Sequence, residues 1–246
     1  MWDGGGLFVG EAGGSTAVHA HYAAQVTVAP SPGLRLRSDD DGPWERYGAA
    51  YVPARSPHAL DVGGVSAWAV IFVGPETARG RALAARFGEA GIREVTTDGL
   101  AEPVAAVFAA WDAGSLGQVE AAAHAVVDVL ASGSGPLGPP DDRVADALTA
   151  IDARLDDPPS LGELARSVGL SPSRLRHLLV GETGAGFRAH VRWRRLMRAW
   201  EIVRAGASLT EAAHAAGFSD SAHLSRTVRR TFGLTPSDVA RAIQRR

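Results

Sequence analysis

Three histidines in the first sixty residues have the type and spacing that metal or ligand chemistry requires. His19 and His21 are separated by one alanine, and side chains two residues apart on a β-strand point to the same face. His58 could add a third imidazole from a distant strand, and neutral imidazole is a common ligand of transition metals. The same residues could instead line a pocket or hold loops together without a metal.

Two segments near the C-terminus repeat one another. Residues 161–171 (LGELARSVGLS) and 209–219 (LTEAAHAAGFS) align at an offset of 48 residues, so Ala165 matches Ala213 and Gly169 matches Gly217. A small alanine lets a second helix cross closely, and a glycine four residues later permits the left-handed backbone of a tight turn. The pattern predicts two helix-turn-helix units. A helical bundle with close packing is the alternative.

The helix after each turn carries polar and basic residues on its outward side. Ser171-Pro172 supplies an N-cap and a first helical proline in one unit, and Ser219 or Asp220 caps the helix in the other. Exposed polar and basic side chains on a second helix are what reading the major groove of DNA requires. The outward residues are Ser173, Arg174, Arg176 and His177 in the first unit, and Ser221, His223, Ser225, Arg226 and Arg229 in the second.

A long helix is predicted between the two repeats, over residues 187–205. It has an apolar face and several arginines around it, Arg194 among them. A rigid helix of this kind would hold the two outward-facing helices at a fixed separation. If that separation is about one DNA turn, ~34 Å, one chain can enter two successive major grooves.

The elements before the repeats change from strands to helices along the chain. Short apolar runs at 7–9, 24–29, 49–52 and 68–73 alternate with turn residues, as is typical of a β-sandwich or barrel. Residues 59–73 predict a hairpin that turns at Gly63-Gly64. Helical periodicity follows from about Thr77, with apolar stripes over 100–111 and 119–130. The segment SGSGPLGPP, residues 132–140, predicts a linker.

The charge is divided between the two halves of the chain. The formal net charge is −2, but residues 1–141 contain 8 basic and 16 acidic residues, whereas residues 142–246 contain 17 and 11. A basic half suggests a nucleic-acid or membrane partner. Every basic residue is arginine, which favours bidentate pairing with phosphate or guanine, although a GC-rich genome would give the same bias.

The composition also excludes several classes of protein. The chain has no cysteine, so disulfides, thiolate metal ligands and a catalytic thiol are excluded. Its longest apolar runs are too short to span a bilayer, and its first residues do not read as a signal peptide. We therefore expect a cytoplasmic protein without a membrane partner.

The second repeat carries the most specific family signature. The stretch AAHAAGFSDSAHLSR at 212–226, followed by FGLTP at 232–236, resembles the AraC/XylS family of bacterial transcription regulators, and the similarity extends over 144–242. The resemblance implies a nucleoid-associated activator or repressor that binds promoter DNA, contacts RNA polymerase if it is an activator, and is not an enzyme. The candidate base readers are Ser173, Arg174, Arg176, His177, Ser221, His223, Ser225 and Arg226, and the candidate phosphate contacts are Arg194, Arg229 and Arg230.

Some positions depart from the family pattern. The family usually has phenylalanine where this chain has Leu179, Leu224 and Val228, which predicts a smaller but still apolar core. Some relatives carry a larger side chain at the position of Ser173. The first helix-turn-helix is therefore expected to read fewer bases than the second helix-turn-helix.

The N-terminal half more loosely resembles the cupin-type sensor domain of many AraC-like proteins. The match rests on His19, His21, Gln25 and His58, and Gln25 stands where cupin enzymes commonly have glutamate. Loss of that anionic ligand favours a metal-free pocket for a small-molecule effector, with no cofactor. The alternative is a metal-dependent cupin enzyme with a DNA-binding regulatory domain. A constitutive DNA-binding protein with a vestigial sensor is a third hypothesis.

The resemblance also implies that the helices at 100–131 form a homodimer interface, although their apolar stripes could equally cover the β-domain. The predicted fold class is α+β, with a cupin-like β-barrel and trailing helices in residues 1–131. A linker at 132–141 leads to an all-α domain at 142–246, in which a long helix joins two helix-turn-helix units.

Overall fold

The computed structural model describes residues 4–11, 13–95, 99–135, 138 and 140–244. The chain forms two compact units. The first unit comprises Met1–Gly135 together with Thr227–Arg246, and the second comprises Pro136–Arg226. The break after Gly135 falls inside the predicted linker, of which residues 136, 137 and 139 lie outside the described residues.

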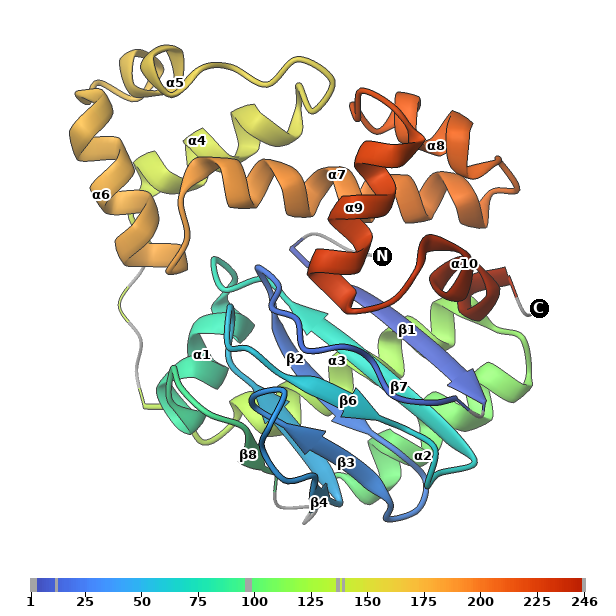
Figure 1. The fold of residues 1–246 in the computed structure, drawn as a ribbon. Helices are drawn as coiled ribbons and strands as arrows, with labels where there is room; N and C mark the ends of the chain where they lie inside the picture. The colour runs from blue at the N-terminus through green and yellow to red at the C-terminus, as the bar shows by residue number, and fades with distance from the viewer. Residues whose placement is uncertain (1–3, 12, 96–98, 136–137, 139, 245–246) are drawn as a thin grey trace. The chain divides into compact units, whose positions relative to one another are not determined.

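The first unit is built on two antiparallel sheets (Figure 1). The larger sheet has the strand order β1-β7-β2-β5-β8 and the smaller has β4-β3-β6. Strands β2 and β5 are buried along their whole length, and alternation in β3 buries Leu34 and Leu36 while Arg35 stays exposed. The strands are β1 (Gly6–Glu11), β2 (Ala24–Val28), β3 (Leu34–Arg37), β4 (Glu45–Tyr47), β5 (Ala49–Val52), β6 (Ala59–Asp61), β7 (Ala67–Val73) and β8 (Arg93–Glu94).

The predicted hairpin over residues 59–73 is wrong. The chain does turn between Val62 and Val65, but β6 pairs with β3 in the small sheet while β7 pairs with β1 and β2 in the large one. The Gly63-Gly64 turn therefore carries the chain from one sheet to the other. Turn residues between two apolar runs give the change of direction but do not identify each strand's partner.

Three helices of the first unit follow β7, with one short strand between them, and Figure 1 shows α2 and α3 behind the large sheet. They are α1 (Ala78–Phe87), α2 (Ala101–Asp112) and α3 (Leu116–Ala131). The apolar stripes of α2 and α3, including Val107, Phe108 and Val126, belong to the same buried cluster as Val26 and Ile71 of the sheet. The stripes thus cover the β-structure, so a homodimer would need other residues.

Helices make up the rest of the chain (Figure 1). Helix α7 is 18 residues long and buries Trp193 and Trp200, and it connects the two repeats as predicted. The helices are α4 (Asp142–Asp152), α5 (Leu161–Ser167), α6 (Pro172–Thr183), α7 (Phe187–Arg204), α8 (Leu209–Ala215), α9 (Ser221–Phe232) and α10 (Pro236–Gln244). No helix in the described part of the chain is both long and apolar enough to cross a membrane.

Both predicted helix-turn-helix units are confirmed in their local geometry. Gly169 and Gly217 have φ of 67° and 80°, the left-handed conformation that the turn requires. Ala165 and Ala213 are fully buried. Both first helices also begin with a capping box, Ser160 with Glu163 and Ser208 with Glu211, in which each pair satisfies two backbone N–H groups.

Residues 227–244 group with the first unit rather than the second. The Phe232 ring contacts the rings of Phe8 and Phe72 edge-on, with centroids 5.5 and 5.7 Å away. The Gly233 carbonyl accepts a hydrogen bond from the Ala17 N–H at 3.1 Å. The boundary between units falls inside α9, which differs from the prediction of one domain over 142–246, because an aromatic cluster ties this segment to the sheet.

Candidate nucleic-acid interface and ligand cavity

Helix α6 presents four candidate base readers to solvent. The Ser171 hydroxyl accepts a hydrogen bond from the Arg174 N–H at 3.2 Å and Pro172 follows it, so the helix begins as predicted. Leu175 and Leu179 are buried on the inner face, which turns the opposite side outward. The exposed residues on that side include Ser173, Arg174, Arg176 and His177.

Helix α9 presents a more mixed face. The Asp220 carboxylate accepts a hydrogen bond from the His223 N–H at 2.6 Å and caps the helix. The Ser225 hydroxyl donates to the Ser221 carbonyl at 2.8 Å, and these two residues and His223 are half-buried. The exposed residues of the predicted set are Arg226, Arg229 and Arg230. Arg226 is therefore the candidate base reader of α9 with the most accessible side chain.

Three arginines of α7 pair with other residues of the second unit. Arg194 donates to the Asp152 carboxylate at 2.8 Å and is 15% exposed. Arg195 donates to the Leu155 carbonyl at 2.8 Å, and Arg198 pairs with Asp156 at 3.1 Å. These partners lie about forty residues earlier in the sequence, so the pattern of residues within α7 could not have predicted them. A phosphate contact by Arg194 stays a prediction, and it would require this ion pair to open.

The three histidines of the first unit converge in space. His19 and His58 form an isolated β-bridge, and their ring centroids are 4.3 Å apart. The His21 ring lies 5.7 Å from that of His19 and 5.0 Å from that of His58. All three are buried. The predicted strand carrying His19 and His21 is wrong, because neither residue lies in a strand and His19 forms only the isolated bridge, yet the expected meeting of the imidazoles occurs.

Each imidazole donates its Nδ1 hydrogen to a backbone carbonyl, at Ala17, Ala23 and Ser56 respectively. In the neutral ring, Nε2 then carries a lone pair. Burial lowers the pKa of all three rings, that of His19 to about 3, so the neutral form dominates at pH 7.

Gln25 closes this cluster. Its side-chain oxygen lies 3.0 Å from Nε2 of His21 and 3.2 Å from Nε2 of His58, while its nitrogen donates to the Thr27 hydroxyl at 2.9 Å. The three histidines each offer a ligand atom within 4.8 Å of the others, so a metal ion that prefers imidazole fits the donor set, with Gln25 as a neutral fourth ligand. Alternatively, a rotated Gln25 amide would donate one N–H to each of the two Nε2 atoms and satisfy them without a metal.

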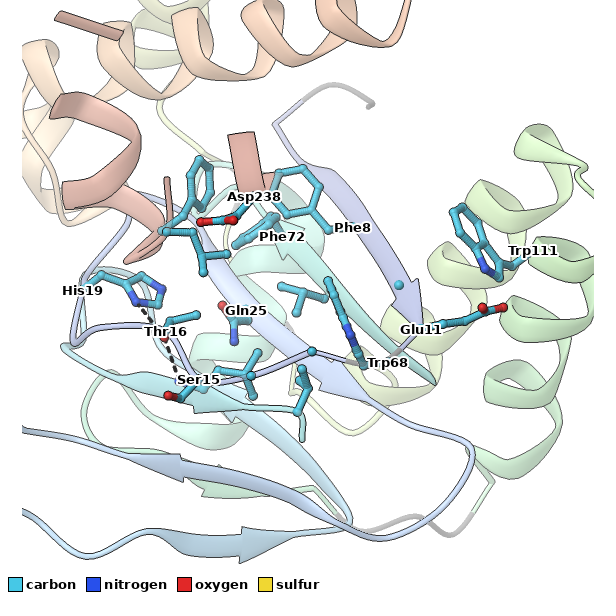
Figure 2. Close-up of a pocket in the computed structure, with 18 residues that line it drawn as sticks. Phe8, Glu11, Ser15, Thr16, His19, Gln25, Trp68, Phe72, Trp111 and Asp238 are labelled. Atoms are coloured by element: carbon cyan, nitrogen blue, oxygen red, sulfur yellow. Dashed lines mark hydrogen bonds between the residues drawn. The ribbon is translucent and has the colours of Figure 1, made fainter. Parts of the chain in front are cut away.

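A cavity of about 750 Å³ opens beside this cluster, within the first unit (Figure 2). His19 and Gln25 lie on its wall, while His21 and His58 do not, so only part of the predicted pocket set lines it. Sequence reasoning missed the aromatic walls, Phe8, Phe72, Trp68 and Trp111, and the C-terminal residues Phe232, Leu234 and Asp238. Their sequence separation left no pattern that could have grouped them.

Comparison with known proteins identifies the helical segment. A model described as a helix-turn-helix domain matches residues 164–242. This segment is an AraC-type helix-turn-helix domain. The regulatory protein PocR of Salmonella typhimurium is 34% identical over 103 residues, which is 42% of this chain. The chain spans about one third, 34%, of the length of that relative.

The fold of the chain is similar to that of ToxT from Vibrio cholerae O395, with a TM-score of 0.61 and 10% identity over 100% of both chains. ToxT bound to (E)-4-(8-methylnaphthalen-1-yl)but-3-enoic acid gives the same TM-score and identity over 97% of this chain and 98% of that one. These similarities concern the fold alone. The predicted fold class, β-structure followed by the AraC-type helical domain, is confirmed.

Proposed function

We propose that this protein is a DNA-binding transcription regulator that reads specific promoter sequences and responds to a small molecule. The observation that carries the proposal is the AraC-type domain with two helix-turn-helix units, in which α6 and α9 turn arginines to solvent on the side opposite their buried leucines. Such side chains recognise base edges in the major groove. It is a regulator rather than an enzyme.

The two helices α6 and α9 enter two successive major grooves on one face of the duplex, joined by the long helix α7. Arg229 and Arg230 meet phosphates, which fix the register of the protein without reading sequence. The protein works in the cytoplasm at the nucleoid, as a homodimer, and contacts RNA polymerase where it activates.

DNA binding by the full chain should depend steeply on salt. The logarithm of the association constant is expected to fall linearly with the logarithm of salt concentration, by about 0.9 for each phosphate contacted, because each contact releases a counterion. Duplexes selected from a random pool should share one sequence, and fluorescence anisotropy from 50 to 300 mM salt gives the slope. A flat salt response without a preferred sequence would contradict the proposal.

The cavity of the first unit is the proposed effector site. It is lined mostly by apolar and aromatic side chains with a few polar groups, as small-molecule sites usually are. A protein of the same fold, ToxT, has been crystallised with an aromatic acid bound.

A metal-dependent cupin enzyme is the second candidate, favoured by the three converging imidazoles. It predicts about one Co²⁺ or Zn²⁺ per chain after incubation and dialysis, lost in His58→Ala, with the visible absorption of tetrahedral Co²⁺ as an independent signal. A regulator without a cofactor predicts far less than one metal per chain. Elemental analysis of the full-length protein separates the two.

A further inference from the structure

One wall of the cavity is formed by Trp68 packed on a glycine of the neighbouring strand. Gly10 faces Trp68 across the β1–β7 pair, and a Cβ atom at Gly10 would lie 2.5 Å from the Trp68 ring. Because glycine has no side chain, the indole of Trp68 can lie against the strand. Gly13 and Gly14 also line the cavity; a Cβ atom at Gly13 would lie 2.6 Å from Val62, whereas one at Gly14 would meet nothing within 4 Å.

The other side of the cavity is aromatic. Phe8 and Phe72 are 5.3 Å apart edge-to-face, and Phe232 contacts both rings. Edges of aromatic rings carry partial positive charge and faces partial negative charge, so such walls favour another aromatic ring over a flexible aliphatic chain.

The charged side chains that line the cavity indicate which charge a ligand can carry. Among the described residues that line the cavity, the charged side chains are the carboxylates of Glu11 and Asp238, and there is no arginine or lysine. A carboxylate ligand would lose its hydration without gaining a cationic partner, which is costly.

The C-terminal segment contributes the remaining wall. Phe232 is the last residue of α9, and Leu234 and Asp238 follow it toward and within α10. Asp238 accepts hydrogen bonds from the Thr235 backbone and hydroxyl and so fixes the start of α10. A bound ligand therefore touches the segment that continues directly from the second DNA-reading helix.

We infer that the cavity binds a planar aromatic molecule that is uncharged or carries an amine, and excludes aromatic carboxylic acids, and that this ligand acts on DNA binding through residues 232–238. The inference rests on the proposed function, because it assigns a ligand class to the proposed effector site.

Three indoles of similar size test the ligand class. Tryptamine carries a positive charge, 3-methylindole is neutral and indole-3-acetate is negative. Calorimetry with the full chain should show binding of the first two, with indole-3-acetate at least about tenfold weaker. Glu11→Gln should reduce the advantage of tryptamine over 3-methylindole, and Leu234→Ala should weaken both, whereas the exposed Leu116→Ala should change neither. Equal or tighter binding of indole-3-acetate, or no binding of any indole at millimolar concentration, overturns the inference.

The effect on DNA is measured separately. Saturating tryptamine should change the affinity of the full chain for its selected duplex by about fivefold or more, and an unchanged affinity overturns the link through residues 232–238. DNA binding without any indole tests the proposed function itself. A chain that binds its duplex but no indole refutes only the ligand class, whereas a chain that binds no DNA refutes the regulator.

Discussion

Replacing Arg226 with alanine is expected to weaken binding to the selected duplex by about 5- to 150-fold, or 1–3 kcal/mol, with little change on random DNA. Arg226 is exposed on α9, and its predicted partner is a base edge, which only the correct sequence supplies. Fluorescence anisotropy of both duplexes at one salt concentration measures the two affinities. Equal losses on both would reassign Arg226 to a phosphate contact.

Arg230→Ala is the matched control, since Arg230 is also an exposed arginine of α9. As a phosphate contact, it should contribute similarly on every sequence, so both affinities fall together and the salt slope becomes shallower by about 1. If Arg230→Ala instead changed sequence preference while Arg226→Ala did not, the assigned roles of the two residues would be reversed.

Acid should destabilise the first unit through its histidine cluster. Burial lowers the pKa of His19 to about 3 and also lowers those of His21 and His58, so the folded protein binds fewer protons than the unfolded chain below about pH 6.5. The stability that these neutral rings contribute is fully present above pH 6.5 and is lost as the pH falls toward 3. For His19 alone, the loss approaches about 1.4 kcal/mol per pH unit within this window.

Urea unfolding of the full chain from pH 8 to pH 4, with a chelator to remove any metal, measures this effect. The unfolding free energy should be nearly constant above pH 7 and decline below 6.5, and His19→Gln should make that decline shallower. The unfolding free energy of His19→Gln at pH 7.5, compared with that of the wild type, shows how much the substitution itself destabilises the fold. A slope that is identical in wild type and variant would contradict a role for His19 in acid sensitivity.

Sequence alone was sufficient for the parts of this protein whose geometry is local. The turn at Gly169 needs only a left-handed glycine, and the start of α6 needs only Ser171 followed by proline, so both could be inferred from a few adjacent residues. Repetition of the pattern at Gly217 made the inference stronger, because chance seldom reproduces a turn twice at one spacing. The apolar periodicity of α7 and α3 predicted these helices for the same reason.

Several contacts between segments far apart in the sequence could be found only from the tertiary structure. The strands around Gly63 joined different sheets, Arg194 paired with Asp152, and Phe232 joined the aromatic cluster of the first unit. In each case several partners satisfy the same local pattern, and the choice depends on which arrangement buries the most apolar surface and pairs the most polar groups.

The histidine cluster was predicted in part from the sequence and in part found only in the structure. Its residue types suggested that His19, His21 and His58 would meet, and they do. Only the folded chain places His21 and His58 behind the cavity wall and brings residues 232–238 to complete that wall. Sequence therefore determined the chemical groups of this protein and its DNA-reading helices, whereas packing between distant segments determined which of those groups a ligand can reach.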